Sequence, residues 1–197
     1  MSWEQFGLAA SFIVVMTITP GPANLSLLSA GATVGFARSL PYLVGIWAGG
    51  ALVISAAAFG LGSLLLAMPT LVSTLKIIGF AYICWLAIKL ARNGFATEGR
   101  KIAPSFASGL ALHPVNPKAY VMNVMTFTAF ILPQDDYAPQ AALLATLTFL
   151  TMTIATSAWG MFGELLQRLI KAPWAMRTIS VAASASMVAS IGLAFFL

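Results

Sequence analysis

A lysine in the middle of a hydrophobic stretch is the residue with the clearest chemical potential in this sequence. Lys118 lies about fourteen residues into an apolar segment that covers residues 105–132. A charged group at the centre of a membrane span costs about 3 kcal/mol or more, so such residues usually have a function. The ammonium could bind a substrate carboxylate or exchange a proton. The alternative is a structural lysine, hydrogen-bonded by backbone carbonyls that Pro114 and Pro117 leave without a helical partner.

Two hydrophobic segments are interrupted by proline next to asparagine. The first interruption reads Thr-Pro-Gly-Pro-Ala-Asn over residues 19–24, and the second reads His-Pro-Val-Asn-Pro-Lys over residues 113–118. Proline removes a helical N–H donor, and non-helical backbone at membrane depth is tolerated where it is buried in protein or lines a cavity. Paired interruptions in the two halves of a chain indicate a transporter's binding site. The residues expected to break the helices are Pro20, Gly21, Pro22, Pro114 and Pro117.

Each interruption contains one asparagine, and the two, Asn24 and Asn116, lie 92 residues apart. Their amide donors and carbonyl acceptors could bind the ammonium and the carboxylate of an amino acid, aided by the N-termini of the helices that resume there. Alternatively, each asparagine caps the resumed helix. The two roles are compatible, so the sequence leaves direct contact with a ligand open.

Two further titratable residues could take part in proton coupling. His113 is the only histidine; an imidazole titrates near neutral pH and could relay protons, although a lone histidine is more often a packing residue with one hydrogen bond. Glu164 is the only acid inside a hydrophobic span, and Arg168 four residues later favours an ion pair on the helix surface. The candidates for proton coupling are Lys118, Glu164 and His113, in that order.

Membrane-spanning helices must position these residues. The chain has 197 residues, of which 60% are hydrophobic and 8% are charged, whereas about a quarter of a soluble domain is charged. We therefore predict an all-α integral membrane protein with one transmembrane domain over residues 1–197. Gly45 and Gly49 predict a close approach between two of its helices. Hydrophobic runs predict six spans, at residues 5–31, 39–67, 70–92, 105–132, 140–166 and 175–197.

The distribution of charge predicts the orientation of these spans. Eight of the ten basic residues fall in connections that are cytoplasmic when the N-terminus is outside, and Asp135 and Asp136 fall on the opposite side. The positive-inside rule then places both termini outside. The polar segment 96–104 separates halves of about 1–95 and 104–197, each with three spans. Because three is odd, the second half enters the membrane in the opposite sense, which predicts two inverted three-helix repeats.

Composition argues against several other classes of protein. The net charge of +5 agrees with basic cytoplasmic loops, so no nucleic-acid partner is predicted. A single cysteine, Cys84, permits no internal disulfide, and no cofactor or metal site is predicted. A membrane-embedded enzyme would need a serine–histidine pair, paired aspartates or a metal cluster, and is disfavoured. The expected partners are the lipid bilayer and a small molecule, and homo-oligomer formation stays open.

Several short motifs also match a known family. They are the Thr-Pro-Gly-Pro-Ala-Asn run over 19–24 with Gly35-Phe36 after it, the segments 45–49 and 79–89, and Asn116-Pro117-Lys118. With these motifs the chain resembles the lysine-exporter/homoserine-threonine-exporter family over its first two-thirds, and the last two spans agree in hydropathy only. The resemblance implies six spans in a bacterial inner membrane and efflux of amino acids driven by the proton gradient.

The chain departs from this family pattern in two places. Gly50 stands where many members have an acid, which disfavours export of a basic amino acid, and His113-Pro114 is an unusual approach to the second motif. The segment 130–134 is similar to the cysteine/O-acetylserine exporter branch. We therefore predict a proton-coupled secondary exporter of small neutral amino acids or derivatives, such as cysteine, O-acetylserine, homoserine or threonine. The alternative is a transporter of another small solute, such as a basic amino acid or a metal ion.

Overall fold

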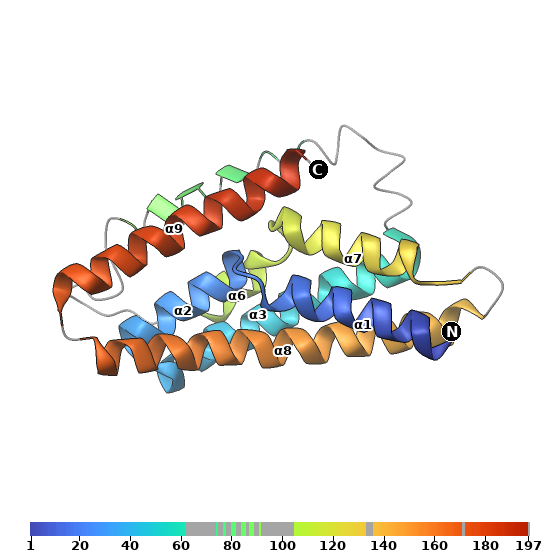
Figure 1. Cartoon of the computed structure of the whole chain (residues 1–197), viewed down its shortest axis with the longest axis horizontal. Helices are drawn as coiled ribbons and strands as arrows, with labels where there is room; N and C mark the ends of the chain where they lie inside the picture. Colours follow the sequence, from blue (N-terminus) through green and yellow to red (C-terminus); the bar gives the residue numbers. More distant parts are fainter. Residues whose placement is uncertain are drawn as a thin grey trace.

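The computed structural model describes residues 1–61, 105–132, 136–170 and 172–196, with scattered positions between 74 and 91. Within this part of the chain all regular secondary structure is helical, so the predicted all-α class is confirmed there. The helices form an elongated bundle (Figure 1). They are α1 (Trp3–Ile18), α2 (Pro22–Val34), α3 (Phe36–Ala56) with the π-helical turn η1 (Ala57–Leu61), α6 (Phe106–Leu112), α7 (Pro117–Ala129), α8 (Tyr137–Leu169) and α9 (Pro173–Phe196).

Both predicted interruptions are present as breaks between helices. α1 and α2 are bent by 46° across residues 19–21, and α6 ends at Leu112 while α7 begins at Pro117. Pro22 and Pro117 occupy the first turn of the resumed helices, where a missing N–H leaves no hydrogen bond unmade. The sequence of each break therefore ends one helix and starts the next.

The other predicted spans agree with the structure to different extents. The fifth prediction, 140–166, corresponds to α8, which extends three residues further at each end, and the sixth corresponds to α9. The second begins at Phe36 rather than at residue 39, because Gly35, with φ of 86°, directly joins α2 to α3. The rest of that prediction (62–67), most of the third (70–92), the linker 96–104 and Asp135 lie outside the described residues.

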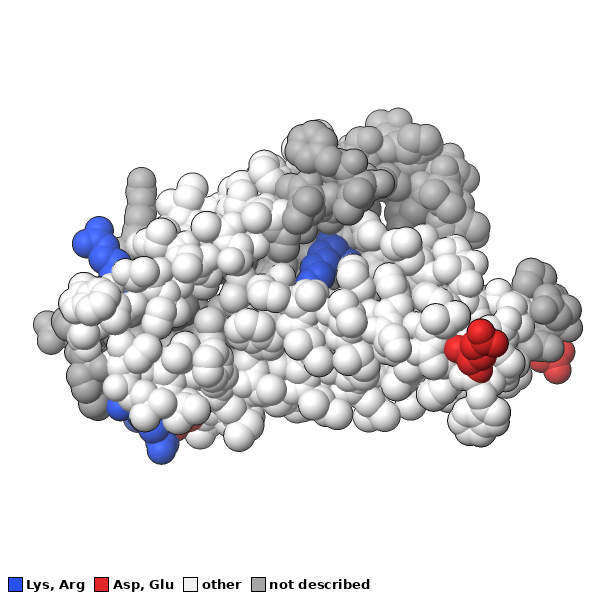
Figure 2. Space-filling model, in the orientation of Figure 1, with Lys and Arg blue, Asp and Glu red and all other residues white. Residues whose placement is uncertain are grey.

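Two of the described helices are long and apolar enough to cross a membrane, over Phe36–Gly60 and Tyr137–Leu169, and the bent pair α1–α2 makes a third if it is one span. Figure 2 shows basic side chains toward one end of the molecule and most acidic ones toward the other. Where the residues are described, the long middle of this face is uncharged apart from one basic group. Such an uncharged belt is the surface expected where lipid surrounds a protein.

The helices approach most closely at glycines. A Cβ atom on Gly45 would lie 2.2 Å from the carbonyl oxygen of Phe106, and one on Gly49 would lie 2.3 Å from that of Leu110. The predicted close approach at this glycine pair is thus confirmed, between α3 and α6. A Cβ atom on Gly163 of α8 would lie 2.0 Å from the carbonyl oxygen of Leu28 in α2. These contacts bring the broken helices against the two long helices that support them.

Candidate functional site

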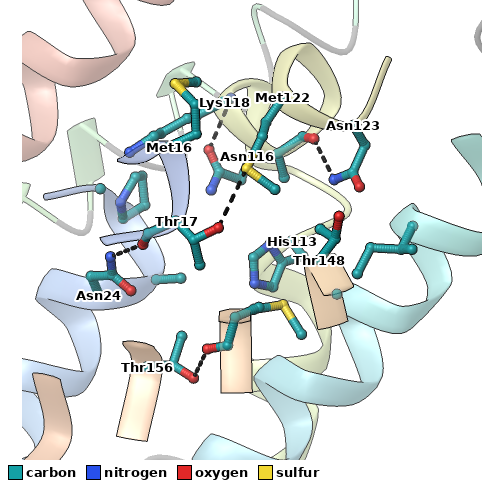
Figure 3. Close-up of a pocket in the computed structure, with 17 residues that line it drawn as sticks. Met16, Thr17, Asn24, His113, Asn116, Lys118, Met122, Asn123, Thr148 and Thr156 are labelled. Carbon is teal, nitrogen blue, oxygen red and sulfur yellow. Dashed lines mark hydrogen bonds between the residues drawn. The ribbon is translucent and has the colours of Figure 1, made fainter. Parts of the chain in front are cut away.

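A cavity lies where the two helix breaks meet, and residues of α1, α2, α3, α7 and α8 complete its walls (Figure 3). Its volume is about 50 Å³, which is room for about three water molecules. The polar side chains that line the cavity are Thr17, Asn24, His113, Asn116, Lys118, Asn123, Thr148 and Thr156.

Lys118 joins the two breaks. Its Nζ atom donates to the hydroxyl oxygen of Thr19 at 2.9 Å and to the backbone carbonyl of Thr19 at 3.1 Å. The carbonyl that the lysine satisfies therefore belongs to the first break, 99 residues away, and not to its own. In its own break the carbonyl of Pro114 accepts from the hydroxyl of Tyr120 at 2.8 Å. Lys118 thus has a structural partner and also lines the cavity.

The ammonium of Lys118 also lies beside the start of α2. A Cβ atom on Gly21 would be 3.1 Å from Nζ, so glycine lets the lysine lie directly against the backbone here. Gly21 is the N-cap of α2 and provides no side-chain hydrogen bond to the first turn. A helix N-terminus carries partial positive charge, and an ammonium has three donors, of which Thr19 takes two. The remaining donor and the helix end can together bind an anion such as a carboxylate.

The two asparagines stabilise the breaks and also line the cavity. The amide nitrogen of Asn24 donates to the carbonyls of Thr17 at 2.8 Å and Thr19 at 3.0 Å, at the end of α1. Asn116 is the N-cap of α7, and its amide oxygen accepts from the N–H of Lys118 at 3.1 Å. The predicted capping of the resumed helix is confirmed for Asn116. It is wrong for Asn24, because Gly21 is the N-cap of α2. Contact of either asparagine with a ligand stays a prediction.

His113 is buried in the cavity wall, as Figure 3 shows, with 9% of its surface exposed. Neither ring nitrogen has a hydrogen-bond partner among the described residues, contrary to the single hydrogen bond expected of a packing histidine. Gly50 makes room for this ring, because a Cβ atom there would lie 3.3 Å from the histidine Cδ2 and 2.3 Å from the sulfur of Met152. The space that an acidic side chain would need at position 50 is thus filled by His113 and Met152.

Glu164 lies outside the cavity lining. Its carboxylate forms the predicted ion pair with Arg168, and its second oxygen accepts from the backbone N–H of Phe36 at 2.7 Å. This glutamate therefore connects α8 to the first turn of α3. The structure brings Asn24, Asn116, Lys118 and His113 together but leaves Glu164 near the end of α8.

Four polar residues of the cavity were not singled out in the sequence: Thr17, Asn123, Thr148 and Thr156. All are buried, and Thr156 accepts from the indole N–H of Trp47 at 3.0 Å. Asn123 had a usable signal, because it is an amide in a hydrophobic segment five residues after Lys118. Thr148 and Thr156 had none, because α8 has many threonines and only its packing distinguishes the two that line the cavity.

Comparison with known proteins places the chain in a family. Residues 14–197 match the family described as LysE type translocator. The cysteine/O-acetylserine efflux proteins of Escherichia coli O157:H7 and Escherichia coli strain K12 are each 32% identical to the chain over 162 residues, which is 82% of this chain and 83% of theirs. No solved structure gives a significant match. The chain belongs to the LysE-type translocator family.

Proposed function

We propose that this protein is a secondary exporter of small neutral amino acids or their close derivatives in a bacterial inner membrane. Membership of a translocator family and the long apolar helices support export across a membrane. The similar proteins are named as efflux proteins for cysteine and O-acetylserine, which supports substrates of that size and charge. The described lining of the cavity includes Lys118 and no carboxylate, which supports neutral substrates over basic amino acids or metal cations.

Lys118 is the observation on which the proposal rests. Its ammonium lies in the cavity between Thr19 and the start of α2, with one donor not used by Thr19. A substrate carboxylate would accept from this donor and lie at the positive end of α2. Asn24 and Asn116 line the same cavity, and we propose that they hold the breaks in shape around the bound molecule.

We further propose that the chain forms six spans in two inverted halves, with both termini outside. The packing of the described helices supports this architecture, because each long helix lies against the broken helix of the other half. α3 packs against α6, and α8 packs against α2. The cavity then lies between the halves, and the breaks allow it to open alternately to each side of the membrane.

Export is proposed to be coupled to the proton gradient. Lys118 and His113 are the titratable side chains among the described lining residues, and they can exchange protons directly next to a substrate. Glu164 would have to act through the α3–α8 contact. We therefore consider Lys118 and His113 before Glu164 as proton carriers.

Replacement of Lys118 by alanine tests the function. In bacteria that overproduce the protein we expect raised external levels of a few neutral amino acids, measured by profiling the medium. Lys118→Ala should lower this excess at least about tenfold, because a charge-assisted hydrogen bond to the carboxylate contributes about 1.5–3 kcal/mol. The amount of protein in the membrane is measured in parallel.

Arg177→Gln is the matched control, because it also removes one positive charge but from an exposed site on α9. This variant should leave the raised external level of neutral amino acids unchanged. Export that persists in Lys118→Ala would disprove the role of the lysine. No change for the unmodified protein across a broad amino-acid panel would count against the function itself.

A further inference from the structure

Two polar side chains in the cavity wall lack hydrogen-bond partners among the described residues. They are His113, through both ring nitrogens, and Asn123, through its amide oxygen. His113 is 9% exposed and Asn123 is 3% exposed, and both line the cavity. The amide nitrogen of Asn123 donates to the carbonyl of Ala119 at 2.8 Å, which orients the side chain. An unmade hydrogen bond is costly in a buried site, so these atoms point to a ligand.

The groups that remain available here are mainly acceptors. Asn123 offers its amide oxygen, and a neutral imidazole has one acceptor nitrogen. Thr148 adds a third, because its hydroxyl hydrogen is donated to the carbonyl of Leu144 at 2.7 Å and only lone pairs remain on the oxygen. A ligand group that matches this set must be a strong donor with several hydrogens. An ammonium, with three N–H donors, is such a group.

We propose that His113, Asn123 and Thr148 form a subsite that binds the α-ammonium of the exported amino acid. This inference rests on the proposed function, in which Lys118 binds the carboxylate of the same molecule. The two charged groups of an α-amino acid are attached to one carbon, so the two subsites must be close. Asn123 and Lys118 both belong to α7 and both line one cavity.

The subsite has a consequence for coupling. A neutral His113 accepts a hydrogen from the ammonium, whereas a protonated ring has only donors and a positive charge that repels the substrate. The other titratable side chain among the described lining residues of α1, α2, α3, α7 and α8 is Lys118, which cannot neutralise an imidazolium. A proton and the substrate therefore compete for the ring of His113. Such competition is what a transporter needs to exchange protons for substrate.

The test compares two ligands that differ only in the ammonium. The complete protein is purified in lipid nanodiscs under reducing conditions, and its affinities for L-cysteine and for 3-mercaptopropionate, which lacks the amino group, are measured by calorimetry. L-Cysteine should bind at least about tenfold more tightly, from its charge-assisted hydrogen bonds. In Asn123→Leu the ratio of the affinity for L-cysteine to that for 3-mercaptopropionate should fall toward one, while the affinity for 3-mercaptopropionate itself is unchanged.

His113→Gln tests the competition with protons. Glutamine keeps an acceptor oxygen but cannot be protonated, so the preference for L-cysteine should persist. In the unmodified protein the affinity for L-cysteine should fall once the pH is low enough to protonate the buried ring of His113. In His113→Gln this fall should be absent. Thr153→Val, which changes a threonine of α8 outside the cavity lining, should match the unmodified protein in both measurements.

The outcomes separate this inference from the proposed function. If Asn123→Leu weakens the binding of both ligands equally, or of neither, the proposed ammonium subsite is wrong. The unpartnered atoms then hold water or only support the fold. An equal pH dependence in His113→Gln would likewise remove His113 from it. If the unmodified protein and Lys118→Ala bind 3-mercaptopropionate equally while the ratio still depends on Asn123, the carboxylate assignment fails and the ammonium subsite stands. Absence of binding of either ligand to the unmodified protein would overturn both.

Discussion

At the scale of single residues, the structural contact of Lys118 is compatible with the ligand-binding role proposed for it. Thr19 accepts two of its hydrogen bonds, and an ammonium has three donors. The structural contact therefore leaves a donor for a ligand and also holds the ammonium next to the start of α2. Because this lysine connects both breaks, binding of a carboxylate to it would affect both of the segments that are proposed to move.

Gly50 gives a prediction about selectivity. In the double variant Gly50→Asp/Met152→Ala, the smaller side chain at 152 leaves room for a carboxylate, since the sulfur of Met152 lies 2.3 Å from where a Cβ on Gly50 would be. The new negative charge in the cavity should attract a second positive charge on the substrate. We expect the profile of exported amino acids to shift toward lysine and arginine.

Gly50→Ala/Met152→Ala is the matched control, because it changes the packing in the same way without adding charge. It should keep the preference for neutral amino acids. If the aspartate variant and this control export the same amino acids, position 50 does not determine selectivity.

The sequence allowed the residues of the two helix breaks to be predicted, but not the distant residues that they contact. A helix break is predicted where proline and asparagine interrupt a hydrophobic segment. A lysine beside them adds a charge that is costly in a membrane. The contact of Lys118 with Thr19, and that of Glu164 with the N–H of Phe36, join residues 99 and 128 positions apart. Such pairs depend on how the helices pack, which no local pattern specifies.

At the scale of helices, the interruptions were predictable because proline acts locally, whereas the choice of packing partner was not. Gly45 and Gly49 indicated that α3 has a close neighbour but not that this neighbour is α6. Likewise, Gly160 and Gly163 lie in a helix with many small residues, and only the structure selects the face that meets α2. The breaks therefore follow from the sequence, but the walls of the cavity do not.

The contact between α2 and α8 should be sensitive to a single methyl group. Gly163→Ala places a Cβ atom 2.0 Å from the carbonyl oxygen of Leu28, so the two backbones must separate. Overpacking of this kind costs about 1–3 kcal/mol. The expected result is a lower melting temperature of the protein in detergent, together with weaker export.

Gly7→Ala is the matched control for this change, because nothing lies within 4 Å of a Cβ atom at that position. It should leave the melting temperature unchanged or raise it slightly, since alanine favours helix more than glycine does. Equal melting temperatures for Gly163→Ala and Gly7→Ala would show that the α2–α8 contact tolerates added volume.

At the scale of the whole molecule, the two ends of the bundle differ in charge and in how closely α2 and α8 pack. Glu4 and Asp136 lie at the starts of α1 and α8, whereas Arg168 lies in the last turn of α8. Gly160 and Gly163, which contact α2 closely, are near the same end as Arg168. In the proposed orientation these close contacts between α2 and α8 lie on the cytoplasmic side of the cavity.

The orientation can be tested with single cysteines, introduced after Cys84 has been replaced by serine. Ser2→Cys and Ala138→Cys should react with a membrane-impermeant thiol reagent added to intact cells, whereas Ala37→Cys and Leu169→Cys should react only after permeabilisation. All four positions are exposed in the structure, so differences in labelling report the side of the membrane. The charges at the two ends predict this pattern through the positive-inside rule. The reverse pattern would show that the protein has the opposite orientation in the membrane. Labelling of positions 2 and 37 from the same side would show that α1 and α2 do not form one span. The proposal of two inverted halves would then lose its basis.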